Sequence, residues 1–156
     1  MSHPFQKVLC AVDFSPSTKL TIATARQIAE ANKGTVILFH VVPMPVEAMG
    51  QPLMVEPLAG AEEDARRRLN RIASEELTHS YEIVVVTGEP AAAIIEAAGQ
   101  QGADLIVMAT HGRTGLSHFF LGSVAERVVR ESSVPVMTVR VPSEKHRLFS
   151  PSVLLG

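Results

Sequence analysis

The sequence contains a single cysteine, Cys10, which excludes an internal disulfide and with it the class of small secreted proteins held together by disulfides. Cys10 stands in the apolar run Val8-Leu9-Cys10-Ala11-Val12, so we expect a buried thiol that takes no part in chemistry. The formal net charge is only -2, and so small an excess gives no general attraction to nucleic acid or to anionic membranes. We therefore expect neither as a partner.

Long apolar stretches and targeting signals are also missing. No apolar run approaches the ~20 residues that a membrane-spanning helix needs. The first residues, Met1-Ser2-His3-Pro4, lack the basic and then apolar pattern of a secretory signal peptide. The sequence therefore predicts a cytoplasmic protein.

The chain of 156 residues, 46% of them hydrophobic, has the length and the apolar content of one domain with a real core. Short apolar runs alternate in it with helical patterns. Strands are predicted at 7–12, 35–42, 82–87, 103–108 and 135–140, and helices at 16–32, 61–79, 91–101 and 123–131. This alternation predicts an α/β fold, a five-stranded, mainly parallel open sheet with helices on both faces.

Three local features sharpen this prediction. Ser15 and Pro16 have the residue types of an N-cap and a first helical residue, which predicts a helix start there. In the last helix we expect Val124, Val128 and Val129 to face inward. Pro135 at the start of the fifth strand predicts an edge strand, because proline cannot donate a hydrogen bond to a neighbouring strand.

The connection after the fourth strand is the first candidate for chemistry. Roughly a dozen residues separate that strand from the helix at Ser123, whereas such connections usually have ~2–6. The connection contains Gly112, Gly115 and Gly122, and it leads into a helix start, where backbone N–H groups and the helix dipole favour an anion. Arg113 adds a cation. These residues predict a polyphosphate cradle; the alternative is a glycine-rich surface loop with Ser123 as an ordinary N-cap.

Two common nucleotide signatures do not account for this connection. The sequence has no Gly-Lys-Ser or Gly-Lys-Thr of a Walker A loop, and no dinucleotide fingerprint follows its first strand. However, Ala109-Thr110-His111-Gly112-Arg113-Thr114-Gly115 and Gly122-Ser123-Val124-Ala125-Glu126 resemble the signature of the universal stress protein family. The opening Val8-Leu9-Cys10-Ala11-Val12-Asp13-Phe14-Ser15 and the ending Ser133-Val134-Pro135-Val136-Met137-Thr138-Val139 resemble that family too.

The resemblance covers nearly the whole chain and implies a universal stress protein domain at 1–141 followed by a C-terminal tail at 142–156. It implies a Rossmann-like sheet, similar to that of the adenine nucleotide α-hydrolases, with strand order 3-2-1-4-5. It also implies that the chain binds ATP, with Mg²⁺ or Mn²⁺ as a candidate cation between the phosphates. The binding residues that it implies are Ala11, Val12, Asp13, Val41, Met108, Ala109, His111, Gly112, Arg113, Gly122, Ser123 and Val124.

One position departs from the pattern of the ATP-binding branch, which has a glycine, two residues, a second glycine, nine residues, and then Gly-Ser or Gly-Thr. Gly112, Gly122 and Ser123 fit that pattern, but Ala109 occupies the first glycine position. Alanine disfavours a positive φ and adds a methyl group that can crowd the ribose. Ala109 therefore favours the alternative of a family member that does not bind ATP and works through protein contacts.

Two polar residues have structural interpretations beside the functional one. Asp13 can contact a nucleotide or its metal ion, or it can accept N–H groups at the next helix start. His40 lies within an apolar strand, so we expect a core histidine with a hydrogen-bond partner.

The sequence gives little support for efficient catalysis. It shows no nucleophile elbow, no zinc motif and no Ser-His-Asp set at telling positions. We therefore expect an ATP-responsive stress or signalling module rather than an enzyme, with slow ATP hydrolysis as a further alternative.

The last strand also predicts self-association. The apolar residues from Val134 to Val139 would leave an unprotected sheet edge, and such edges are usually covered. Members of the family that the chain resembles pair their last strands across a two-fold axis, so we expect a homodimer formed in this way.

Overall fold

The computed structural model describes residues 4–44, 60–110 and 121–141, and the predicted tail at 142–156 lies outside them. Strands and helices alternate along the described ranges, as the apolar periodicity predicts. Their bounds are β1 (Lys7–Ala11), α1 (Thr18–Ala31), β2 (Thr35–Pro43), α2 (Ala61–Glu76), β3 (Tyr81–Gly88), α3 (Pro90–Gln100), β4 (Leu105–Ala109), α4 (Ser123–Glu131) and β5 (Val136–Val139).

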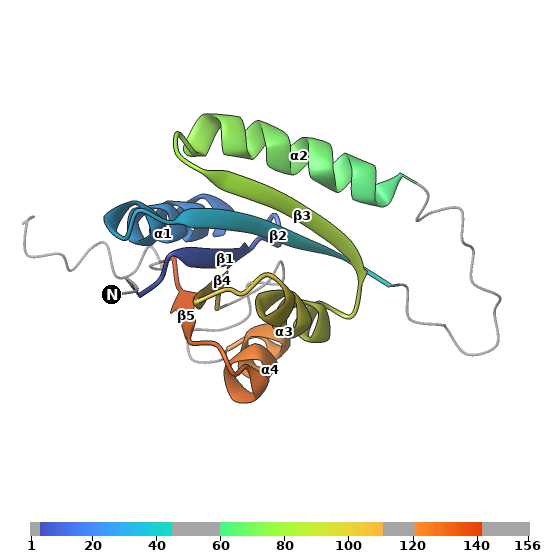
Figure 1. The fold of residues 1–156 in the computed structure, drawn as a ribbon. Coiled ribbons are helices and arrows are strands. Elements are labelled where there is room, and N and C mark those ends of the chain that lie inside the picture. The colour runs from blue at the N-terminus through green and yellow to red at the C-terminus, as the bar shows by residue number, and fades with distance from the viewer. Residues whose placement is uncertain (1–3, 45–59, 111–120, 142–156) are drawn as a thin grey trace, which may run out of the picture.

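The strands form one five-stranded sheet in the order β3-β2-β1-β4-β5, and every neighbouring pair is parallel (Figure 1). Leu9 at the centre of β1 is in register with Ile37 of β2 on one side and Ile106 of β4 on the other. The predicted fold class and strand order are thus confirmed, and so is the edge position of β5. Pro135 immediately precedes β5, and its carbonyl accepts the N–H of Ile106 at 2.9 Å.

Helices cover both faces of the sheet, with α1 and α2 on one face and α3 and α4 on the other (Figure 1). Successive strand residues point to opposite faces, and therefore each central strand contributes to two cores. Val8 and Cys10 of β1 pack with α1 and α2, whereas Leu9 packs with α3 and α4. Burial on both faces explains why the central strands are apolar almost throughout.

Three details of the helices differ from the prediction. Helix α2 ends at Glu76 and not at about His79. Helix α1 begins at Thr18, after an N-cap at Ser17, and not at Ser15 and Pro16. In α4, Val128 is fully buried but Val129 is 46% exposed, and Ala125 is buried instead. Val129 follows Val124 by five residues, which is about 140° around a helix, so the two side chains cannot share one face.

A further expectation concerns the burial of Cys10. Cys10 is completely buried, and this burial raises the pKa of its thiol to about 12. The thiol therefore stays protonated at neutral pH.

Within the described ranges, no helix has the length and the apolar character needed to cross a membrane.

Candidate functional site

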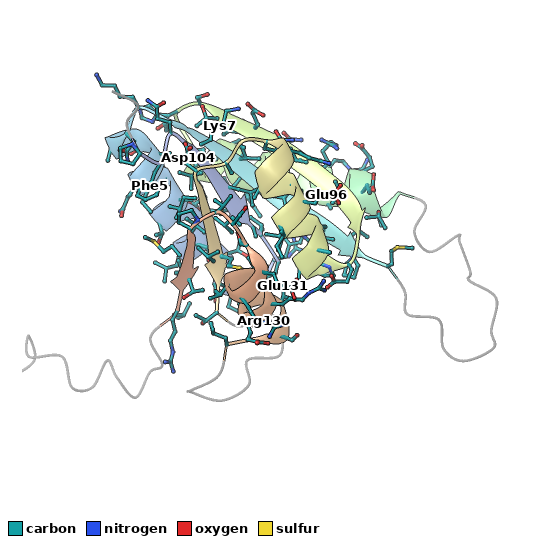
Figure 2. All side chains as sticks on the ribbon, turned by 60° about the horizontal axis from the view of Figure 1, so that its bottom comes forward. Phe5, Lys7, Glu96, Asp104, Arg130 and Glu131 are labelled. Carbon is teal, nitrogen blue, oxygen red and sulfur yellow. The ribbon has the colours of Figure 1, made fainter. Side chains whose placement is uncertain are left out.

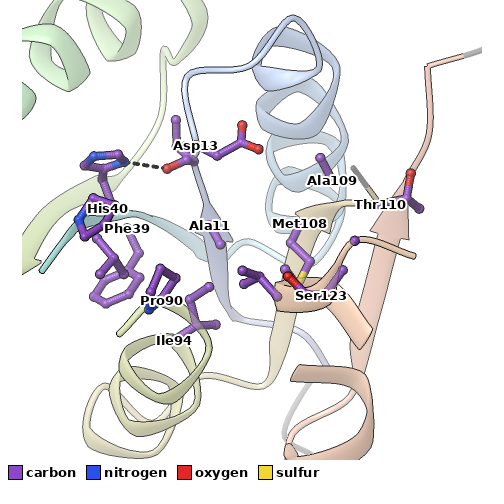
Figure 3. Close-up of a pocket in the computed structure, with 16 residues that line it drawn as sticks. Ala11, Asp13, Phe39, His40, Pro90, Ile94, Met108, Ala109, Thr110 and Ser123 are labelled. Carbon is purple, nitrogen blue, oxygen red and sulfur yellow. Dashed lines mark hydrogen bonds between the residues drawn. The ribbon is translucent and has the colours of Figure 1, made fainter. Parts of the chain in front are cut away.

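A cavity of about 320 Å³ opens at the carboxyl ends of the central strands (Figure 3). Its described lining comes from the ends of β1, β2 and β4 and from the starts of α3 and α4. The chain leaves β1 toward β2 on one side of the sheet and returns through β4 on the other, so the cavity lies at the topological switch point. Ligands of open α/β sheets bind at this point.

The start of α4 supplies polar backbone groups to the wall. Its N-cap is Gly122, which has no side chain to cap the helix, and the first intrahelical bond runs from the Glu126 N–H to the Gly122 carbonyl at 2.9 Å. The N–H groups of Ser123, Val124 and Ala125 therefore have no intrahelical acceptor. All three residues line the cavity. Ser123 is the first helical residue, so the interpretation of Ser123 as an ordinary N-cap is wrong.

The Gly122 backbone is fixed from the other side by strand β4. The Gly122 N–H donates to the Thr110 carbonyl at 2.6 Å, and the Thr110 N–H donates to the Val139 carbonyl at 2.9 Å. Gly122 has φ -58° and ψ 156°, which any residue can adopt. The backbone conformation at this position therefore does not require glycine.

Asp13 follows β1 and lines the cavity. Its Oδ1 accepts the Ser15 N–H at 2.9 Å, across a turn in which Phe14 has a φ of 57°. This turn accounts for the late start of α1, because the hydroxyl of Ser15 accepts the Ser17 N–H within the turn instead of capping a helix. Asp13 thus has the structural role that the sequence left open, and it also borders the cavity.

The remaining lining is mainly apolar. Phe39 and Val41 of β2, Met108 of β4, and Pro90 and Ile94 of α3 contribute to it (Figure 3). The surface suits a flat apolar group such as a base, whereas the start of α4 suits an anion.

His40 also lines the cavity, and it is buried as expected, with 6% exposure. A hydrogen bond of 2.7 Å joins its Nδ1 to the Val12 carbonyl (Figure 3). Since a carbonyl only accepts, Nδ1 carries the proton of this bond. The Phe14 ring packs against the imidazole, with 4.4 Å between the ring centroids. His40 therefore holds the end of β1 against β2.

A comparison with known proteins identifies the family to which this chain belongs. The sequence model of the universal stress protein family matches residues 4–140. The chain belongs to the universal stress protein family.

Individual relatives agree with this assignment. A universal stress protein of Thermus aquaticus is 33% identical over 143 residues, which cover 87% of this chain and 99% of the relative. One from Methanocaldococcus jannaschii is 27% identical over 90% of this chain and 98% of its own length. The solved structure of the latter superimposes with a TM-score of 0.74 and covers 90% of this chain and 99% of that one.

A further solved structure bears on ligands. It is a universal stress protein in complex with cAMP, 26% identical, with a TM-score of 0.65, and it covers 88% of this chain and 98% of its own. A relative of the same family and fold thus binds an adenine nucleotide.

Nine of the residues predicted for the site of this universal stress protein line the cavity together: Ala11, Val12, Asp13, Val41, Met108, Ala109, Gly122, Ser123 and Val124. The other three, His111, Gly112 and Arg113, lie outside the described residues. The prediction omitted seven lining residues: Phe39, His40, Pro43, Pro90, Ile94, Thr110 and Ala125. One signal could have found Pro90, because every helix that follows a parallel strand begins at the carboxyl edge of the sheet.

Ala109 is compatible with the backbone at the first glycine position. It is the last residue of β4, and it is absent from the described non-glycine residues that have a positive φ. The conformational argument against alanine therefore does not apply here, and only its methyl group distinguishes it from glycine. Within the described residues, no group of three histidine, cysteine or acidic side chains is placed to hold a metal ion.

Proposed function

We propose that this universal stress protein binds ATP or a related adenine nucleotide in the cavity and acts as a stress-response or signalling module. One observation carries the proposal: the uncapped N–H groups of Ser123, Val124 and Ala125 lie at the topological switch point, where an anion is the ligand that they favour. The adenine nucleotide bound by a related family member supports the same ligand class.

The two halves of the lining suggest how the nucleotide is oriented. The apolar surface of Phe39, Val41 and Ile94 suits the base, and the start of α4 suits the phosphates. Asp13 also lines the cavity, and its carboxylate can contact the ribose or a Mg²⁺ or Mn²⁺ ion on the phosphates. Such an ion, when bound, would neutralise part of the phosphate charge.

We propose a binding role rather than an enzymatic one, with at most slow ATP hydrolysis. In the described lining, Ser123 stands at a helix start without a base bonded to it, and Asp13 already accepts a backbone N–H. Neither arrangement matches the paired nucleophile and base of an efficient hydrolase. We also propose a cytoplasmic location, where ATP is available and the single thiol stays reduced.

Calorimetric titration with Mg-ATP tests the proposal on the wild type and on two matched glycine variants. Gly122→Val places a side chain in front of the helix start, and we expect at least about a tenfold loss of affinity because hydrogen bonds to a charged ligand are blocked. Gly99→Val is the control, since Gly99 is an exposed residue of α3 with open space beside it. Circular dichroism checks that both variants fold.

The outcomes separate the candidate functions. If the wild type and Gly122→Val bind Mg-ATP with equal affinity, the nucleotide does not bind at the start of α4. If the wild type binds no nucleotide at all, the family member that acts only through protein contacts becomes the better proposal. Several turnovers per minute in a phosphate-release assay would replace the binding module by an ATPase.

We further propose that the chain forms a homodimer through β5. This strand is a sheet edge, and Met137 within it and Val141 just beyond it are each 40% exposed. Exposed apolar side chains on an unpaired edge favour strand pairing. In sedimentation velocity at micromolar concentration we expect twice the chain mass for the wild type and a monomer for Met137→Lys. Tyr81→Lys on the opposite edge is the control, and a monomeric wild type would contradict the proposal.

A further inference from the structure

A single carboxylate joins the two helices that begin at the cavity. Glu89 precedes α3, and its Oε1 and Oε2 accept the N–H groups of Ala91 at 3.1 Å and Ala92 at 2.9 Å. The same Oε2 accepts a hydrogen bond from Nη1 of Arg127 in α4 at 2.5 Å. The start of α3 is therefore tied to the first turns of α4 by a charge-assisted bond.

The position of Arg127 relates this bond to the start of α4. Arg127 follows Ser123 by four residues, which is about 6 Å along the helix axis. Its guanidinium reaches across to the N-cap of α3, because Nη1 bonds to Oε2 of Glu89. Its Nε also pairs with Oε2 of Glu131 at 3.2 Å.

The charge of Glu89 matters because Pro90, its neighbour, lines the cavity. The bond from Ala92, with those from Ala91 and Arg127, holds the pKa of Glu89 below its ordinary value of 4.5, so the side chain is ionised at neutral pH. Without Arg127, this negative charge would stand unpaired next to α4, the helix whose start favours anions. Exposed charges act on one another within about one Debye length, which is ~8 Å at physiological salt.

We propose that Arg127 is a positioning residue that makes the cavity selective for phosphorylated nucleosides, because its ion pair with Glu89 neutralises the carboxylate at the start of α3, next to α4. The inference rests on the proposed function and adds to it a residue that does not line the cavity. It concerns the charged part of the nucleotide only. Binding of an uncharged nucleoside depends on the apolar lining, and Arg127 is not one of the described lining residues.

Affinities for two ligands, Mg-ATP and uncharged adenosine, test the inference by calorimetry. We expect Arg127→Gln to weaken ATP binding about three- to tenfold and adenosine binding less than twofold, since only ATP meets the uncompensated carboxylate. The matched control is Arg130→Gln. Arg130 lies one turn further along α4 and pairs with Glu126 and Glu131 on its own helix (Figure 2). We expect this variant to bind both ligands as the wild type does.

A second variant separates charge from structural support. Glu89→Gln combined with Arg127→Gln removes both charges but leaves the tie between the helices broken. We expect the double variant to recover ATP affinity to within about threefold of the wild type, and we expect the ATP defect of Arg127→Gln to shrink in ~0.5 M salt. A purely structural role of Arg127 would produce neither result.

Four outcomes would overturn the inference. Equal losses for ATP and adenosine in Arg127→Gln would reduce Arg127 to a structural tie. If the double variant does not recover ATP affinity, charge neutralisation by Arg127 is excluded. If the wild type binds neither ligand, the proposed function is overturned as well. If the wild type binds ATP and the variants bind it with the same affinity, this inference alone is overturned.

Discussion

Helices α3 and α4 both begin beside the cavity, but their first turns are built in opposite ways. At α3, Pro90 has no N–H at the first helical position, and Glu89 accepts the next two N–H groups. At α4, the N-cap is Gly122, and among the described residues no side chain caps the N–H groups that follow. A capped start stabilises its helix by about 1 kcal/mol. The start of α4 forgoes this stabilisation and keeps its donors available for a ligand.

The largest expected effect comes from giving α4 a cap of its own. In Gly122→Asp the new carboxylate accepts a backbone N–H of the first turn and places a negative charge where the phosphates would lie. We expect ATP affinity to fall about a hundredfold, while the free energy of unfolding stays constant or rises by a few tenths of a kcal/mol. Titration calorimetry and urea unfolding measure the two quantities. Gly122→Ala, which adds no acceptor, should lose less affinity, and ATP binding retained by Gly122→Asp would disprove the role of these donors.

A smaller effect is expected when α4 is given the proline of α3. Ser123→Pro removes one uncapped N–H, and the ψ of 156° at Gly122 suits a residue before proline. The helix should therefore remain stable, while ATP affinity falls about five- to tenfold through the loss of one donor to a charged ligand. Ser123→Ala separates the hydroxyl from the N–H. If Ser123→Ala and Ser123→Pro bind ATP equally well, the N–H of residue 123 does not contact the ligand.

The smallest expected effect concerns the capped start of α3 at acid pH. Bonds from Ala92 and Ala91 and the charge of Arg127 lower the pKa of Glu89 from its ordinary 4.5. A carboxyl whose pKa is lower in the folded state stabilises the fold above its unfolded pKa, and this stabilisation is lost as the pH falls through the folded value. We expect urea unfolding to show a weaker loss of stability below pH 4.5 in Glu89→Gln than in the wild type. Glu96→Gln, at a residue of α3 that caps nothing, should behave as the wild type, and equal pH profiles of Glu89→Gln and wild type would contradict the prediction.

Much of the fold could be predicted because its signals are local and periodic. The bounds of α4 coincide with the predicted 123–131, since glycine and serine before an amphipathic segment mark a helix start. The sequence predicts a start of α1 that is too early, because Ser15 and Pro16 are also typical of turns. These residues form a turn, which is stabilised by the hydrogen bond from Ser15 to Asp13 and in which Phe14 has a positive φ.

The candidate site was predicted less completely than the fold. Residues on the predicted strand ends and on the glycine-containing segment could be named, because the family pattern marks them in the sequence. Pro90 and Ile94 carry no such mark. They reach the cavity because the order β3-β2-β1-β4-β5 brings the start of α3 to the same edge as that of α4.

The sequence by itself determined the alternation of strands and helices, the edge position of β5 and the absence of a side-chain acceptor at Gly122, because each of these depends on residues close together in the chain. Only the tertiary structure decided which helix starts share the cavity and which charges meet there. The ion pair between Glu89 and Arg127 joins residues 38 positions apart, and no local pattern specifies it. Its geometry depends on how α3 and α4 pack against the same face of the sheet, where burial of the shared core fixes their separation.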